Sequence, residues 1–416
     1  MAAALVMGNM IGSGVFLLPA SLAPYGGLGL IGWLVSTAGS VLLALVFARL
    51  SRCNPAAGGP YAYTRQAFGD LAGFLVAWGY WISVWCTNAA LAVALVGYLG
   101  PFIPSVVSKP PAAAALAVAT LWFLTAVNVL GVRTAGRVQV VTTAIKILPL
   151  AAVGIAGLFS LDPAHFAIAQ TGGAAVARGI TATATLTLWA FLGLECATIP
   201  AGSIRDPERT IPRATVTGTI AAGVVYIVST VGVLGVLPPA VLGRTTAPFA
   251  EAARALAGDR AALAVALGAA ISCFGALNGW ILIVGQLPMA VAADGLFPRV
   301  FSRLSPRGTP VTGMIIAGAL STALISMNYS RSLVDLFTFI ILLATLSTLV
   351  PYAFCSLAGF VVRPGTAALS RSAAIIAALA FGYSLWAIGG AGAEVVYWGF
   401  LLLIAGLPVY VWVLRR

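Results

Sequence analysis

Small and polar residues interrupt the first hydrophobic segment of the chain, where residues 7–16 read MGNMIGSGVF. Glycine costs about 1 kcal/mol relative to alanine inside a helix, and a backbone group without a helical partner costs several kcal/mol in hydrocarbon. A break at Gly12 and Gly14 is therefore expected where it lines a polar site, because half-helices that meet in mid-membrane offer amides to an anion and carbonyls to a cation. The alternative is close helix packing, since Gly8 and Gly12 form a GxxxG pair.

A second interruption follows at residues 189–200, WAFLGLECATIP, in which Gly193 stands two residues before Glu195. Corresponding breaks five spans apart are typical of two inverted five-helix repeats, with the last two spans outside the repeat. No residue-level repeat is visible, so this symmetry is inferred from position. The paired breaks favour a binding site at Gly12, Ser13 and Gly14.

Glu195 is one of two ionisable residues expected well inside the membrane, about 8 residues or roughly 12 Å from the cytoplasmic end of its span. A charge at that depth costs roughly 2.5–3.5 kcal/mol on insertion scales. Two interpretations stay open. The carboxylate could serve the first turn of a second half-helix, where the dipole favours an anion. Alternatively, it holds the broken region in one state and releases it in another, with proton binding as the trigger.

Lys146 is the other buried ionisable residue, in VTTAIKILPLA of the fifth span. It lies about 10 residues or roughly 15 Å deep, beyond the ~6 Å that a snorkelling lysine reaches, so it must face polar groups. The fifth span is expected to pack against the first break, where an ammonium could replace a bound Na⁺. Lys146 is therefore either a structural tether or a coupling group that loses its proton in one state.

Three further side chains are candidates for substrate contact. Trp189 and Trp280 could offer indole faces to a cation or an apolar side chain, or they are core tryptophans. Asn88, in the third span, needs a partner in lipid, which is either another helix or a ligand.

The composition is that of a multi-span membrane protein. Of the 416 residues, 61% are hydrophobic and only 8% are charged, and the mean hydropathy is +1.05, far from soluble globular chains. The +12 charge lies in short loops without a basic, aromatic stripe, so no nucleic-acid partner is expected. Five cysteines and a single histidine show no metal-type spacing, so neither a metal nor another cofactor is expected. The first segment is expected to remain as a span, because it lacks the basic start of a cleaved signal peptide.

Apolar stretches of about 20 residues predict an all-α fold with twelve spans. They cover residues 2–23, 29–50, 71–103, 111–131, 136–160, 179–203, 213–237, 260–293, 310–328, 333–362, 372–390 and 394–414. The chain is expected to form one membrane domain, 1–416, with 1–160 as the first repeat, 179–362 as the second and 372–414 as the last two helices.

The basic residues predict that both termini are cytoplasmic. Fifteen would lie on the inner side: Arg49, Arg52, Arg65, Arg133, Arg137, Arg205, Arg209, Arg213, Arg299, Arg303, Arg307, Arg363, Arg371, Arg415 and Arg416. Six would lie outside: Lys109, Arg178, Arg244, Arg254, Arg260 and Arg331.

Several sequence blocks together resemble the amino acid, polyamine and organocation transporter superfamily, and within it the bacterial arginine/agmatine and related basic amino acid/polyamine antiporters. They are GNMIGSGVFLLPA (8–20), PAAGGPYAYTRQAFG (55–69), LWAFLGLECA (188–197), DPERTIPRA (206–214), NGWILIVGQ (278–286), AADGLFP (292–298) and TLVPY (348–352). The resemblance implies a LeuT-like fold with helices 1 and 6 broken, a homodimer in the bacterial cytoplasmic (inner) membrane, and alternating access without Na⁺.

The resemblance also implies roles for individual residues. The substrate carboxylate would be bound by the amides and hydroxyl of Ile11, Gly12, Ser13 and Gly14. The α-amino group would be bound by carbonyls around Met10, Trp189 and Leu192. Trp189 would be the gating aromatic, Trp280 would stack on the substrate side chain, Asn88 would be a polar pocket residue, and Glu195 would act in gating or proton sensing.

Three positions depart from the arginine/agmatine pattern. Ala344 stands where those antiporters have a serine, and Val84 replaces a more polar neighbour on the third span. Lys146 is absent from them but resembles the fifth-helix lysine of Na⁺-independent, proton-coupled or exchanging amino acid permeases. These departures favour a neutral or broader amino acid substrate.

The sequence therefore predicts a secondary transporter embedded in lipid, not an enzyme, because no span offers a Ser/His, paired Asp or His/Glu metal constellation. The leading hypothesis is an antiporter that exchanges an amino acid, such as arginine, for a related amino acid or its decarboxylated amine. The alternative is a proton-coupled symporter or exchanger of neutral amino acids that uses Lys146. A channel is the hypothesis from another class, and uptake that accelerates with internal amino acid would count against it.

Overall fold

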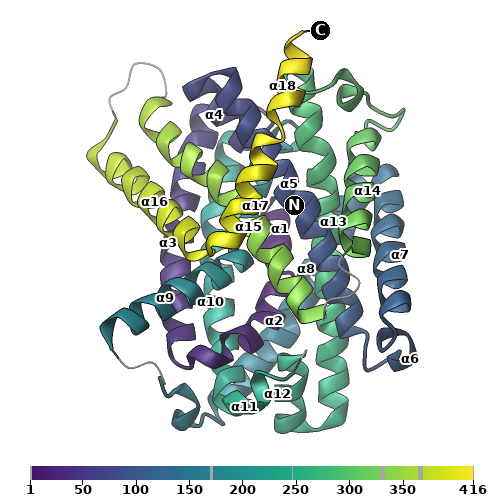
Figure 1. Cartoon of the computed structure of the whole chain (residues 1–416), viewed down its shortest axis with the longest axis vertical. Coiled ribbons are helices and arrows are strands. Elements are labelled where there is room, and N and C mark those ends of the chain that lie inside the picture. Colours follow the sequence, from purple (N-terminus) through teal and green to yellow (C-terminus); the bar gives the residue numbers. More distant parts are fainter. Residues whose placement is uncertain (1, 169–171, 246, 328–332, 364–368, 416) are drawn as a thin grey trace.

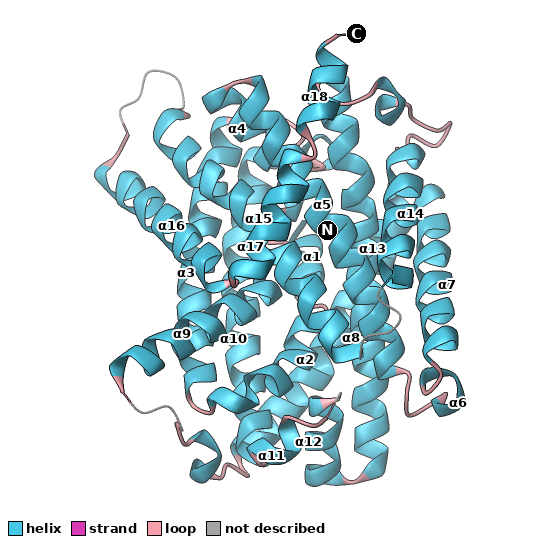
Figure 2. Cartoon of the chain, viewed as in Figure 1, coloured by secondary structure: helices cyan, strands magenta, loops and turns pink. Residues whose placement is uncertain are grey.

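The computed structural model describes residues 2–168, 172–245, 247–327, 333–363 and 369–415, and these ranges contain helices and loops without a strand (Figure 2). Eleven of the described helices are long and apolar enough to cross a membrane, and Val311–Ser326 is a shorter apolar helix. This confirms an all-α membrane protein with twelve segments. Arg331 and Arg416 of the charge count lie outside the described residues.

The segments follow one another along the chain with short connections (Figure 1). They are α1 (Ala2–Met10) with α2 (Ser13–Leu22), α3 (Leu28–Cys53), α5 (Asp70–Tyr98), α7 (Pro110–Val129), α8 (Val132–Leu158), α9 (Gly173–Leu188) with three 3-10 turns, α10 (Pro207–Val236), α13 (Asp259–Ala293), α14 (Val311–Met327), α15 (Leu333–Val361), α16 (Arg371–Gly390) and α17 (Ala393–Ile404) with α18 (Leu407–Leu414). The division into two inverted repeats stays a prediction.

The third and twelfth segments differ from the predicted spans for reasons that are visible in the sequence. The third helix ends at Tyr98 instead of continuing to residue 103, because Gly100 and Pro101 follow. The twelfth span is divided between α17 and α18 at Gly406, with Pro408 in the first turn of α18. Proline at such a position lacks the N–H group that a continuous helix needs.

The central helices are α1, α2, α5 and α13. The most apolar part of α5 is 94% buried, compared with 11% for the Ala393–Leu414 segment, so α17 and α18 are peripheral. α1 packs against α8, α10 and α13, whereas α5 packs against α13 and α15. One end of the bundle carries the short helix α4 (Pro60–Phe68), and the opposite end carries α11 (Pro239–Leu242) and α12 (Pro248–Ala257) (Figure 1). We refer to these as the α4 end and the α12 end.

Candidate binding site at two broken helices

The first break separates α1 from α2 at Ile11 and Gly12. The amide of Ile11 donates to the Met7 carbonyl at 2.8 Å, and the amide of Gly12 donates to the Met10 carbonyl at 3.0 Å. Both amides are therefore occupied in this conformation. Of the residues expected to bind the substrate carboxylate, Ser13 and Gly14 therefore remain. They begin α2, and the first N–H groups of a helix have no helical acceptor and favour an anion.

Lys146 holds the carbonyls that the first break releases. Its Nζ donates to the carbonyls of Gly8 and Ile11, each at 2.6 Å, and its side chain is fully buried. The Ser272 hydroxyl of α13 adds bonds to the carbonyls of Ile11 (3.2 Å) and Gly12 (3.4 Å). The ammonium thus lies at the break as the depth argument predicted, and the geometry is that of a tether. A coupling role for Lys146 stays a prediction.

The second break replaces the expected second half-helix with 3-10 turns. α9 ends at Leu188, and η3 (Trp189–Phe191), η4 (Cys196–Thr198) and η5 (Ala201–Ser203) follow. Gly193 has φ +108°, which favours glycine. A Cβ there would also lie 3.0 Å from the Asn9 Cβ and 3.2 Å from Trp280 Cζ2. The sequence prediction of a half-helix was wrong here, and Pro200 explains part of the difference because it cannot donate within a helix.

Glu195 joins the second break to two neighbouring helices. Its buried carboxylate accepts hydrogen bonds from the hydroxyls of Tyr80 on α5 and Tyr352 on α15. Its side chain does not cap η4, so the contacts disfavour the helix-dipole interpretation. A further contact links the breaks directly, since Asn9 Nδ2 donates to the Cys196 sulfur at 3.1 Å.

A small cavity lies between the two breaks. It is lined by Asn9, Met10, Gly12, Ser13, Gly14, Thr87, Leu91, Trp189, Leu192 and Trp280. Its volume of about 10 Å³ holds roughly one water molecule. An amino acid therefore needs the surrounding side chains to move before it fits. The most direct obstacles are Trp189, whose Cδ1 lies 2.8 Å from a Cβ built on Gly14, and Trp280, whose Nε1 donates to the Asn9 carbonyl at 3.2 Å.

The comparisons with known proteins agree with this architecture. A family model described as amino acid permease matches residues 1–411. The chain belongs to the amino acid permease family. The resemblance predicted from the sequence blocks is thereby confirmed.

Three curated relatives cover most of the permease and are named for transport. A cadaverine/lysine antiporter of Escherichia coli K12 is 36% identical over 84% of this chain and 80% of its own length. A putative arginine/ornithine antiporter of Bacillus subtilis 168 is 34% identical, with 99% and 96% covered. The putrescine transporter PotE of Escherichia coli K12 is 30% identical, with 98% and 93% covered. The family and these relatives point to a transporter, not an enzyme.

The structure brings seven of the predicted substrate residues to the cavity and leaves three away from it. Ile11, Asn88 and Ala344 do not line it. Asn88 is buried, and its Oδ1 has no hydrogen-bond partner within the described part of the chain. The sequence reasoning missed Asn9, Thr87 and Leu91, and only the small size of the first-break residues hinted that α5 comes close.

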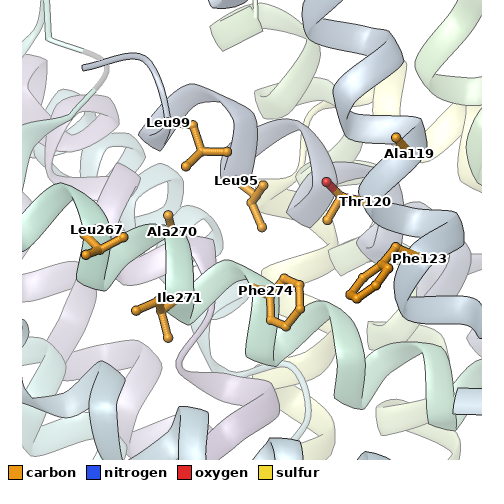
Figure 3. A pocket seen from close by; sticks show the side chains of 9 residues that line it. All are labelled: Leu95, Leu99, Ala119, Thr120, Phe123, Leu267, Ala270, Ile271 and Phe274. Carbon is orange, nitrogen blue, oxygen red and sulfur yellow. The ribbon is translucent and has the colours of Figure 1, made fainter. Parts of the chain in front are cut away.

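A larger hollow of about 430 Å³ lies between α5, α7 and α13 (Figure 3). Its lining includes the exposed side chains of Phe123 and Leu267, and its one polar side chain, Thr120, donates to the Leu116 carbonyl at 2.9 Å. A charged substrate has no partner there. The smaller cavity at the breaks is therefore the candidate site of the permease, despite its volume.

A cluster of polar contacts at the α4 end of the permease joins α4 to the start of α5 and to the residue after α13. Asp294, just after α13, accepts from the Tyr61 hydroxyl at 2.8 Å and pairs with Arg65 at 2.7 Å, and Arg65 also pairs with Asp70 at 2.7 Å. Burial and Asp294 raise the pKa of Tyr61, and the hydrogen bond to Asp70 raises the pKa of Arg65. Both groups therefore keep their protons and remain donors through the physiological range. We call these four residues the α4 clamp.

Proposed function

We propose that this permease is a Na⁺-independent antiporter that exchanges an amino acid for a related amino acid or its decarboxylated amine by alternating access. The names of its relatives support amines and basic amino acids as substrates. The observation that carries the proposal is the small cavity between the two breaks, which is lined by the start of α2, including Ser13 with its unpaired hydroxyl. Such a cavity suits a small zwitterion that is exposed to one side at a time.

The contacts of Lys146 support independence from Na⁺. Half-helix carbonyls are typical Na⁺ ligands in related architectures. Here the ammonium already donates to the carbonyls of Gly8 and Ile11. In this proposal the Lys146 ammonium supplies at the first break the positive charge that a sodium ion would otherwise supply.

The second candidate is a proton-coupled symporter or exchanger of neutral amino acids. It is favoured by the full burial of Lys146, which makes its charged form costly. The apolar residues Val84 and Ala344 also favour a substrate without a charged side chain. In this version Lys146 releases its proton during the transport cycle.

The setting of the proposal is a bacterial inner membrane. The chain is a multi-pass membrane protein, and the excess of arginine near α4 supports a cytoplasmic α4 end with both termini inside. Its partners are the transported amino acid or amine, membrane lipid, protons in the second candidate, and a second copy of the chain as a homodimer.

Counterflow in proteoliposomes tests the proposal. Vesicles loaded with arginine, agmatine, ornithine, putrescine, lysine, cadaverine, alanine or leucine are assayed for uptake of each labelled compound. Antiport predicts uptake that needs internal substrate and ignores a pH gradient. Uptake into empty vesicles that follows an imposed pH gradient would support proton symport instead, and uptake only of alanine and leucine would reject basic substrates.

A further inference from the structure

Thr87 lines the cavity and carries a buried hydroxyl without a partner among the described residues. The residue lies on α5, is only 2% exposed and lines the cavity. Its Oγ1 makes no hydrogen bond within the described part of the chain. The Ser13 hydroxyl is likewise buried and unpaired on the wall that α2 provides. Two residues that line one small cavity from two helices thus carry buried, unpaired hydroxyls.

Other threonines in the helices of this chain show what Thr87 does not do. Thr125, Thr219 and Thr345 each donate to the carbonyl four residues earlier, at 2.8, 2.7 and 2.7 Å. This bond is the usual way to satisfy a threonine hydroxyl inside a helix. The Thr87 hydroxyl does not make this bond, so it remains available to a ligand. A buried hydroxyl without a hydrogen bond costs free energy, which a bound ligand could recover.

The surroundings of Thr87 favour an ammonium as its partner. The carboxylate of an amino acid is best bound at the start of α2. Three of the nearby carbonyls already accept a bond: that of Met10 from the Gly12 amide, that of Trp189 from the Leu192 amide, and that of Asn9 from Trp280. The Thr87 oxygen is a free acceptor on the same cavity.

Resting on the antiport function proposed above, we infer that Thr87 is a substrate-binding residue whose hydroxyl accepts a hydrogen bond from a substrate ammonium. An amino acid and its decarboxylated amine share this group, whereas only the amino acid has a carboxylate. Thr87 therefore acts on both exchanged compounds. The start of α2, with Ser13, acts on the amino acid alone.

Homoexchange in proteoliposomes tests this assignment with lysine and cadaverine, and with ornithine and putrescine. Thr87→Val should raise KM about tenfold for the amino acid and the amine alike, the loss expected for one hydrogen bond to a charged group. The maximal rate should stay within about twofold of wild type, and Thr87→Ser should restore KM. Ser13→Ala should raise KM for the amino acid only.

Thr230→Val is the matched control. Thr230 on α10 is also buried with an unpaired hydroxyl but does not line the cavity, so this variant should match wild type. An unchanged KM in Thr87→Val while wild type exchanges both compounds would overturn the Thr87 assignment alone. A KM raised for the amino acid only would also overturn it, since the hydroxyl would then bind the carboxylate. Absence of exchange by wild type would overturn the proposed function, and the assignment with it.

Discussion

The two breaks that border the cavity are held in different ways. The first keeps an α-helix on each side, and its released carbonyls are bound by Lys146 of α8 and Ser272 of α13. The second continues as 3-10 turns and is held through Glu195 by tyrosines on α5 and α15. Donors to the backbone hold the first break. The second is held by the buried Glu195 carboxylate, together with a bond from the Tyr226 hydroxyl to the Ala190 carbonyl at 2.9 Å and the contact of Asn9 with Cys196.

This difference suggests that the two breaks have different functions in transport. A break whose backbone is fixed on both sides offers ligand groups in a constant geometry, as binding requires. A break that a titratable carboxylate ties to two neighbouring helices can be loosened by changing that group, as a conformational switch requires. We therefore expect changes at the first break to act on binding and on the assembly of the site, and changes at the second to act on the rate of the cycle.

Replacing Lys146 by alanine should give the largest effect. Two buried carbonyls lose a charged donor, and hydrogen bonds to charged groups contribute about 1.5–3 kcal/mol each. Exchange should fall by at least about a hundredfold while the protein still elutes as a folded species in detergent. Lys109→Ala, at the exposed lysine of the chain, is the control and should transport normally. Wild-type rates for Lys146→Ala across pH 5–8 would reject the idea that the ammonium organises the first break.

Gly193→Ala should have the second largest effect, because the positive φ and a close contact both oppose a side chain at this position. The left-handed region and the 3.0 Å approach to the Asn9 Cβ together cost about 1–3 kcal/mol. The midpoint of thermal unfolding should fall by several degrees and exchange should drop about tenfold. Gly202→Ala is the control in the same segment, since its Cβ would meet no atom within 4 Å. Equal behaviour of the two variants would show that the second break tolerates side chains at its turn.

Glu195→Gln should distinguish the roles of the two breaks most clearly, because it changes only the second. The amide oxygen can still accept from one tyrosine, but the second tyrosine loses an anionic acceptor. The contact of residue 195 with Tyr80 and Tyr352 is therefore weakened and not abolished. We expect the maximal exchange rate to fall about fivefold with KM within about twofold, and Tyr80→Phe to behave similarly. A raised KM with an unchanged maximal rate would place Glu195 in contact with substrate and remove the distinction between the breaks.

The sequence predicted the breaks and their charges because these signals are local. Glycines within apolar spans, and single charges at depth, are visible without knowing which helix faces which. Lys146 could be placed at the first break from its depth and the expected architecture alone. The twelve segments followed equally well from hydropathy.

The residues that complete the site could not be predicted in the same way. Tyr80, Tyr352 and Thr87 are ordinary core residues in sequence, and their roles depend on which face of each helix meets the breaks. Adjacent residues on a helix point about 100° apart. Thr87 therefore lines the cavity while Asn88 does not.

The α4 clamp should give the smallest effect and tests whether the breaks, not the loops, set the rate. Asp294→Asn removes the charge that pairs with Arg65, but the side chain of Asp294 is 46% exposed, and exposed ion pairs contribute about 0–1 kcal/mol. In the alternating-access cycle proposed above, closing the α4 end is one step, so exchange should slow by less than about threefold. The loss should shrink further in high salt, which screens the same pair in wild type.

Glu251→Gln is the control. This variant breaks the exposed pair with Arg254 at the α12 end and should leave the rate unchanged. If Asp294→Asn instead slowed exchange more than Glu195→Gln does, closure at the α4 end would limit the rate of the transport cycle. The rate would then be set by the α4 clamp and not by the second break.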